Sequence, residues 1–412
     1  ANTTGASNVA VGYAALDANT TANYNIAVGY NALTANTTGT QNVAVGASAL
    51  KAVITANYNT AVGTSSLETN VAANNTAVGW NTLNANTTGA DNVAVGFGAL
   101  EANTTGNHNI GIGGYYPLGA NTTGHRNIAI GYGAYNSSNT EDDNLAIGFN
   151  AMTTNTEGGT QNVAIGNYVL DALTSGDSNT SVGYNSLGAN TTASNNTAVG
   201  ASALAANAQG ASNVAIGMNA LATFNYGSAA DTYNVAIGRG SLENTSNGVQ
   251  NVAVGGLALT TNTTASNNTA LGHFALRLNT TGATNTAVGG AVLAANTTAS
   301  YNTGVGYAAL NANTTGASNT GIGYYALVAN TTGASNIAVG GNSLDANTTG
   351  NYNVAMGVSA LSANTTASNN TGIGYQALKA VTTGANNVAV GSSAGDVVTT
   401  GAGNTGIGQT AL

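Results

Sequence analysis

The chain has 412 residues, of which only 5% are charged, and it contains 57 glycines, one proline and no cysteine. Its net charge of −9 and its five basic residues exclude a nucleic-acid-binding protein, because a phosphate backbone requires a basic surface. No apolar run approaches the roughly 18 residues of a membrane span, and the β-branched residues at regular positions argue against a disordered chain.

The chain is built from 24 tandem units that share the pattern N-x-x-x-G, most of them 17 residues apart. The first three pairs are Asn8 with Gly12, Asn25 with Gly29, and Asn42 with Gly46. We predict one continuous repeat domain over residues 1–412. Its irregular units, at 102–119 and 223–243, are where loops can project outward. These loops are the best candidates for recognition of a specific partner, and the alternative is neutral variation in loop length.

Each unit contains two candidate strands and a turn. In the first unit the strands are NVAVG at 8–12 and YAAL at 13–16, and a turn such as ANTTG at 1–5 joins successive units. The frequent glycines and the lack of a sustained 3.6-residue period exclude helices. The pattern therefore predicts an all-β fold, a parallel β-solenoid or β-roll of 24 coils with about 17 residues per coil.

Equivalent residues should form columns along such a stack. The column of Val11 and Val28 is aliphatic in all 24 units, and the column of Leu16 and Leu33 is Leu in 21 of them, so we predict that these two columns form the core. The residue between the branched ones, such as Ala10, is always small and points to the opposite face of the strand. Because neither face carries charge, we expect the small face to contact a second chain.

The column of Asn8, Asn25 and Asn42 predicts a ladder of side-chain amides that bond to the neighbouring coils and to the backbone at the turn into the strand. A row of ligand-binding amides is the alternative, which only the residue type supports. The column that follows Leu accepts charge and should face solvent: Asp17, Lys51, Glu68, Glu101, Asp171, Glu243, Arg277, Asp345 and Lys379.

The residue after the glycine is often aromatic. The simpler interpretation is an aromatic ladder that covers the edge of the coil, and the alternative is a strip that contacts glycans. Two further aromatic candidates, Phe224 and Tyr226, lie in the irregular unit at 223–243. The candidates for surface contact are Tyr13, Tyr30, Trp80, Phe97, Tyr132, Phe224 and Tyr226.

Charge is concentrated in one region, where His108, Arg126 and Asp143 occupy the same place in three successive units. We predict that they stack in one column with Arg126 beside Asp143, and that His125, Glu141 and Asp142 lie next to them. An exposed ion-pair cluster is more common than a metal site for such residues. The sequence has no repeated GGxGxD calcium motif and no Ser/His/Asp, phosphate-loop or paired-carboxylate pattern, so we predict no catalytic residue, metal or cofactor and no enzyme activity.

The turn sequence NTT matches the N-glycosylation signal at many positions, although Asn and Thr are also ordinary turn residues. The matches include Asn2, Asn19, Asn36, Asn86 and Asn103.

The strand NVAVG or NIAIG, followed by a short second strand and a Gly-containing turn, resembles the head repeats of trimeric autotransporter adhesins of the YadA type. Repeats of the form NTAVGYxALxxNTTG are similar to those of viral and phage tail-fibre proteins. The resemblance covers essentially all 412 residues. It implies a left-handed parallel β-roll in which three chains pack side by side. The 17-residue unit is longer than the usual head repeat, and the stalk, neck and membrane anchor of the family have no counterpart.

We therefore expect a structural fibre at a cell or virion surface, formed by a homo-oligomer for which the resemblance favours a trimer. Head-to-tail filaments are a further expectation, because QTAL at 409–412 would continue almost in phase into ANTT at 1–4. The alternative is an adhesin or receptor-binding fibre that contacts surface glycans. A minor alternative is an ice-binding solenoid, for which NTT would supply ladders of threonine.

Overall fold

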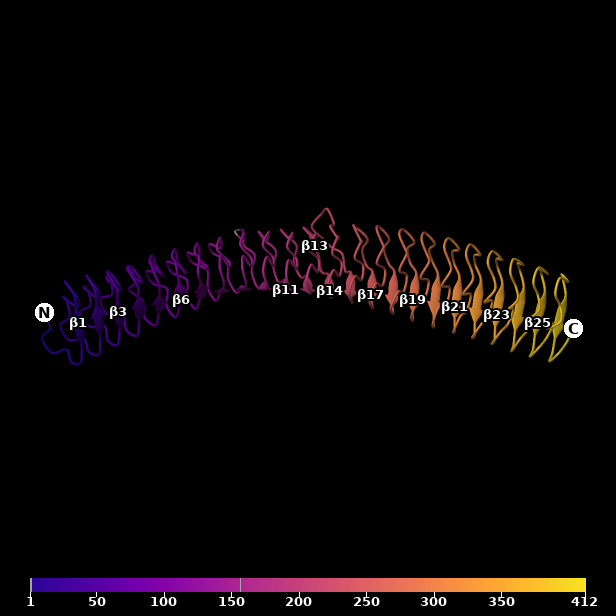
Figure 1. Cartoon of the computed structure of the whole chain (residues 1–412), viewed down its shortest axis with the longest axis horizontal. Coiled ribbons are helices and arrows are strands. Elements are labelled where there is room, and N and C mark those ends of the chain that lie inside the picture. Colours follow the sequence, from indigo (N-terminus) through magenta and orange to yellow (C-terminus); the bar gives the residue numbers. More distant parts are fainter. Residues whose placement is uncertain (1, 156) are drawn as a thin grey trace. The chain divides into compact units, whose positions relative to one another are not determined.

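The computed structural model describes residues 2–155 and 157–412, and it is an all-β parallel β-solenoid with no helix in those ranges (Figure 1). The chain divides into two compact units, Ala1–Ala211 and Ser212–Leu412. Within the described ranges no segment forms a helix with the length and hydrophobicity needed to cross a membrane. The predicted fold class is confirmed.

Most coils contribute one strand of three or four residues. Those of the first unit are β1 (Val9–Val11), β2 (Ile26–Val28), β3 (Val43–Val45), β4 (Thr60–Val62), β5 (Thr76–Val78), β6 (Val93–Gly96), β7 (Ile110–Gly113), β8 (Ile128–Ile130), β9 (Leu145–Ile147), β10 (Val163–Ile165), β11 (Thr180–Val182), β12 (Thr197–Val199) and the short β13 (Gly210–Ala211). Those of the second unit are β14 (Val214–Ile216), the short β15 (Ala230–Asp231), β16 (Val235–Ile237), β17 (Val252–Val254), β18 (Thr269–Leu271), β19 (Thr286–Val288), β20 (Thr303–Val305), β21 (Thr320–Ile322), β22 (Ile337–Val339), β23 (Val354–Met356), β24 (Thr371–Ile373), β25 (Val388–Val390) and β26 (Thr405–Ile407).

Within each unit, the strands of successive coils pair in parallel and in register. Val11 lies beside Val28 and Ala10 beside Ala27 across β1 and β2, and the same pairing links β16 to β17 and β25 to β26. Residues 17 apart therefore form columns, as the repeat predicts. A column of identical residues is stable here because each side chain contacts its own equivalent in the adjacent coils.

The prediction of a second strand in each coil is wrong. The residues after the strand form turns, and in the first coil Ala14 and Leu16 have φ of 51° and 54°. A left-handed backbone, which costs roughly 1–2 kcal/mol per residue, is incompatible with a regular β ladder. Hydrogen bonds between coils offset this cost: the backbone N of Leu33 donates to the carbonyl O of Ala49 at 3.0 Å. The segment is thus tied to its neighbour without being a strand.

The glycine that follows each strand has a geometric reason. Gly12 has a φ of +134°, and a Cβ added there would lie 2.5 Å from the carbonyl O of Gly29. Both the left-handed backbone and the close approach of the next coil exclude any side chain at this position. The chain can therefore turn sharply out of the strand only where glycine stands.

The interior is lined by the small face of the strand, and the prediction that Val11 and Val28 form the core is wrong. Ala27 and Leu33 are fully buried, whereas Val11 is 57% exposed and Val28 is only half-buried. A 17-residue coil is too thin to hold both Leu and a β-branched strand residue. The small face consequently packs against its own coil and does not meet a second chain.

Crowding inside the coils shows how little space remains. A Cβ added at Gly304, on the inward face of β20, would lie 2.4 Å from Cγ1 of Val292 in the preceding coil. Most inward strand residues are alanine, and beyond the first coil these are fully buried, as Ala236 and Ala253 are. Leucines and small residues therefore fill the interior, and the valines and isoleucines of the strands lie on the outside.

Candidate functional surfaces

Two columns of buried asparagine connect the coils. In the first, Oδ1 of Asn25 accepts a hydrogen bond from the backbone N of Asn42 at 2.9 Å, and its Nδ2 donates to the carbonyl O of Gly39 at 2.8 Å. The Asn8 amide likewise accepts from the backbone N of Asn25 at 2.8 Å. Because these amides are used within the protein, they hold the turn into each strand and offer no groups to a ligand.

The second column lies in the NTT turn, for which sequence reasoning proposed only a turn-forming role. Nδ2 of Asn103 donates to Oδ1 of Asn86 at 2.7 Å and to the carbonyl O of Gly106 at 3.1 Å. The signal was present in the sequence, because asparagine recurs at this one position of the turn. Four of the five glycosylation signals named above are closed in the folded protein because their asparagines are fully buried: Asn19, Asn36, Asn86 and Asn103. Asn2, in the first coil, is exposed.

The threonines of the NTT turn also bond within the solenoid. Oγ1 of Thr280 donates to the carbonyl O of Thr297 at 3.0 Å, and Oγ1 of Thr297 donates to that of Thr314 at 3.1 Å. The hydroxyl hydrogens of this column therefore point to carbonyl groups. They are poorly placed to order surface water, so the ice-binding alternative gains no support from this column.

The outward face of the sheet is apolar. We define the apolar stripe as the first and third residues of strands β1–β12, β14 and β16–β26; all of them are Val, Ile, Leu, Met or Thr. Leu271 and Met356 are 45% and 42% exposed. The column of residues that follow Leu is exposed to a degree similar to that of the stripe. The side chains of Lys51 and Glu68 in this column are 45% and 27% exposed, and both are charged. Charge is therefore absent from the stripe although the exposure would permit it.

The aromatic column forms ring stacks on the surface. Tyr13 stacks on Tyr30 with ring centroids 5.4 Å apart, and Trp80 stacks on Phe97 at 4.8 Å. Tyr132 stacks on Phe149 at 5.2 Å, and all six rings are exposed. Parallel rings offset along a ladder are a favourable aromatic geometry, so the column covers the edge of the coil and still presents apolar surface to solvent.

The candidate Phe224 is not a surface residue. Its side chain is fully buried, and it stands where other coils place the asparagine of the NTT turn. Its backbone N donates to the carbonyl O of Leu221 at 3.3 Å, as the N of Asn207 does to that of Leu204 at 3.2 Å. An apolar ring can replace the amide because the position faces the interior. Tyr226, with its ring 6.5 Å from that of Phe224, is half-buried.

The charged cluster contains the expected ion pair. Nη2 of Arg126 donates to Oδ2 of Asp143 at 2.9 Å and lies 3.5 Å from Oδ2 of Asp142. Its hydrogen bond to Asp143 holds the pKa of that carboxyl below its ordinary value. Oδ1 of Asp142 in turn accepts from the backbone N of His125 at 2.6 Å. No group of three metal-ligating side chains occurs among the residues of the described ranges.

Glu141 differs from its charged neighbours because it is buried. Its Oε2 accepts hydrogen bonds from Oγ of Ser138 at 3.1 Å and from the backbone N of Asn139 at 2.7 Å. This carboxylate therefore closes a turn that lacks the usual asparagine. Next to it, burial raises the pKa of Tyr135, whose hydroxyl accepts a hydrogen bond from Asn144. Neither group is open to a ligand.

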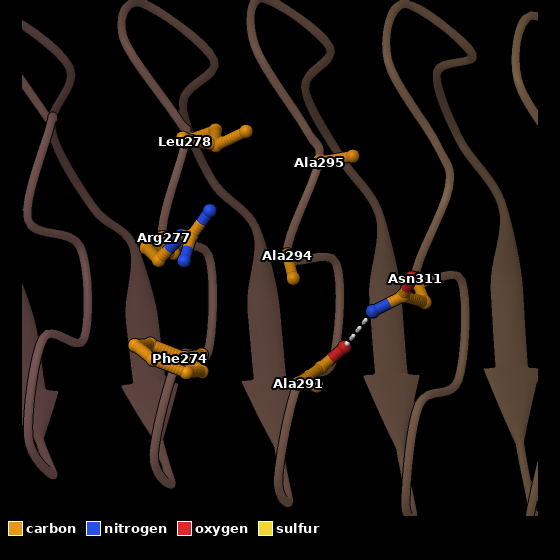
Figure 2. A pocket seen from close by; sticks show the side chains of 7 residues that line it. All are labelled: Phe274, Arg277, Leu278, Ala291, Ala294, Ala295 and Asn311. Atoms are coloured by element: carbon orange, nitrogen blue, oxygen red, sulfur yellow. Dashed lines mark hydrogen bonds between the residues drawn. The ribbon is translucent and has the colours of Figure 1, made fainter.

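A groove of about 300 Å³ lies on the surface of the second unit (Figure 2). The guanidinium carbon of Arg277 lies 4.9 Å from the centre of the Phe274 ring. Nδ2 of Asn311 donates to the carbonyl O of Ala291 at 2.8 Å. The residues that line the groove are Phe274, Arg277, Leu278, Ala291, Ala294, Ala295 and Asn311.

Comparison with known proteins finds no family model and no curated protein that matches the chain. Its class follows from the fold: it is a tandem-repeat β-solenoid. The surfaces just described are consequently the basis for assigning a function.

Proposed function

We propose that the chain is a structural fibre protein at a cell or virion surface, and that copies of it associate side by side through the apolar stripe. The observation that carries the proposal is the absence of charge from this half-exposed face in every coil. Extended uncharged apolar surface on a soluble protein commonly marks an interaction site. The repeated coils of each unit supply a regular scaffold rather than a reaction centre.

The partner that fits the stripe best is a second copy of the chain. The stripe repeats with each coil, at the strand spacing of about 4.8 Å. A surface with the same spacing and the same lack of charge is the stripe of another copy. The net charge of −9 repels a second copy only at long range, where salt screens it, because none of the charged residues belongs to the stripe. The likeness to YadA-type head repeats supports three chains as the number of copies, and it also supports an extracellular location.

Oligomeric state tests the proposal. Analytical ultracentrifugation of the wild-type chain should show a defined oligomer, and Val62→Lys with Val254→Lys, one change in each unit, should dissociate it. Lysine in the stripe would bury an unpaired charge at each interface. The matched control is Thr34→Lys with Ser362→Lys, in the half-buried column that already holds Lys51. A monomeric wild-type chain with a β-rich circular dichroism spectrum would exclude side-by-side association.

The head-to-tail stacking of copies stays a prediction, which electron microscopy of the assembled protein would test. Filaments longer than a single chain would support it, and isolated particles of one length would contradict it.

A second candidate function is adhesion through the aromatic column. The observation that favours it is the exposure of the stacked rings, such as Tyr13 on Tyr30. Exposed aromatic faces provide contact area at low cost in side-chain entropy. On a glycan array, binding that is lost in Tyr13→Ala with Tyr30→Ala, but not in the stripe variants, would support adhesion. A wild-type chain that binds no glycan would leave the scaffold role alone.

A further inference from the structure

The groove beside Arg277 arises because one coil lacks the side chains that its neighbours carry. Phe274 and Arg277 stand on one coil, and the equivalent positions of the next coil are Ala291 and Ala294. Asn311 bounds the opening on the following coil (Figure 2). Strands two coils apart are separated by about 9.6 Å, twice the ordinary strand spacing. The result is a slot with an alanine floor and two polar or aromatic walls, open to solvent.

The slot continues along the same unit. A second hollow of about 380 Å³ shares Ala291 and Asn311 with it and is lined further along by Tyr307, Tyr325 and Val328. The two hollows together form an elongated groove with aromatic rings at both ends. Such a shape accommodates a chain of linked rings better than a compact molecule.

The electrostatics of the groove differ from those of the rest of the chain. Arg277 is one of only five basic residues, and the lining of both hollows contains no Asp or Glu. Lys51 and Arg126 are held in ion pairs, whereas the Arg277 guanidinium forms no ion pair with any described residue and contacts the Phe274 ring. Stacking on an aromatic ring fixes the plane of a guanidinium and leaves its N–H groups free to bind a carboxylate in a bidentate manner.

We propose that this groove binds an acidic saccharide, with the carboxylate of a sugar ring on Arg277. The C–H face of the sugar packs on the Phe274 ring and the alanine floor. The next sugar rings run toward Tyr307 and Tyr325. Asn311 donates through Nδ2 to Ala291, so its Oδ1 serves as an acceptor for a sugar hydroxyl.

This site is independent of side-by-side association. None of the residues that line either hollow belongs to a strand, so the stripe variants leave the groove intact. Tyr307, which follows Gly306, belongs to the aromatic column, whereas Phe274 and Arg277 do not. The saccharide site and the fibre can therefore fail or hold separately.

Calorimetric titration of the full chain tests the site with two carboxylate sugars, trigalacturonate and 3′-sialyllactose. At least one should bind, and its carboxyl methyl ester should bind at least tenfold more weakly because esterification removes the negative charge and the pair of equivalent oxygens that a bidentate contact needs. Arg277→Gln should reduce affinity by a similar factor, and Phe274→Leu should reduce it several-fold. Lys379→Gln, which removes a basic residue from the same column far from the groove, should have no effect.

Three results would overturn the proposal. Neither acid binds the wild-type chain, or the methyl ester binds as well as the acid, or Arg277→Gln binds as well as the wild type. Acetate in place of the sugars serves as a further control, because acetate binding of equal strength would reduce the site to an anion contact. A circular dichroism spectrum equal to that of the wild type is required of each variant, and Arg277→Lys, which keeps the charge without the planar fork, should retain part of the affinity.

Discussion

Replacing one asparagine of the first ladder should weaken the solenoid at a defined place. Oδ1 of Asn251 accepts from the backbone N of Asn268 at 3.0 Å, and its Nδ2 donates to the carbonyl O of Ala265 at 2.9 Å. Asn251→Ala leaves the buried N–H of Asn268 without a partner, whereas the Ala265 carbonyl keeps its hydrogen bond from Nδ2 of Asn262 at 3.1 Å. An unsatisfied buried group costs about 1–3 kcal/mol, and we expect a loss of that size in the local free energy of opening.

Hydrogen exchange measures this loss better than a global melting curve, because coils of a solenoid open locally and chiefly affect their neighbours. A loss of 2 kcal/mol corresponds to about 30-fold faster exchange, which the peptide containing the Asn268 amide should show. Asn244→Ala is the control, since Asn244 is exposed and should leave the rate unchanged. If Asn251→Ala altered exchange no more than this control, the ladder would not stabilise the coils.

Two further comparisons use neighbouring residues of one coil. Gly255→Ala should lower the melting temperature strongly, because φ is +135° and the new Cβ would lie 2.6 Å from the carbonyl O of Gly272, whereas Gly256→Ala, with its nearest neighbour at 3.4 Å, should be nearly neutral. In urea unfolding at low protein concentration, Ala253→Val should cost about 1–3 kcal/mol by overpacking a closed interior. Val254→Ala, on the half-exposed face, should cost under about 1 kcal/mol, and the reverse order would place the valines inside.

The period of the chain was enough to predict the columns. Once residues 17 apart lie side by side, the pairing of Val11 with Val28 and of Arg126 with Asp143 follows without knowledge of the turn between them. The conformation of that turn could not be predicted. A left-handed φ at Leu16 has no sequence signature, because leucine disfavours this region and adopts it here only under the constraint of the neighbouring coils.

The groove was hidden from the sequence for a related reason. The groove exists because positions 291 and 294 carry alanines in place of larger side chains, and because particular columns border these alanines in space. Arg277 was recognised only as a member of a charged column. Its position over Phe274 requires the turn geometry that brings residues three apart onto one surface. For Phe224 the sequence predicted a surface residue on an exposed loop, but the ring is fully buried in the interior.

Periodicity alone could not predict which face of each strand points into the coil. An alternating pattern defines two faces but not which one is inside when both are uncharged, and hydrophobicity alone favours valine over alanine for the core. The deciding quantity is interior width: Leu33 and Asn25 are both fully buried from the turns of the coil, and the strand can then contribute only a methyl group such as that of Ala27. The valines are therefore outside, and their freedom from charge cannot be explained by the core. Strands favour β-branched residues in general, and the proposed contact with a second copy of the chain would add a further reason for the lack of charge in every coil.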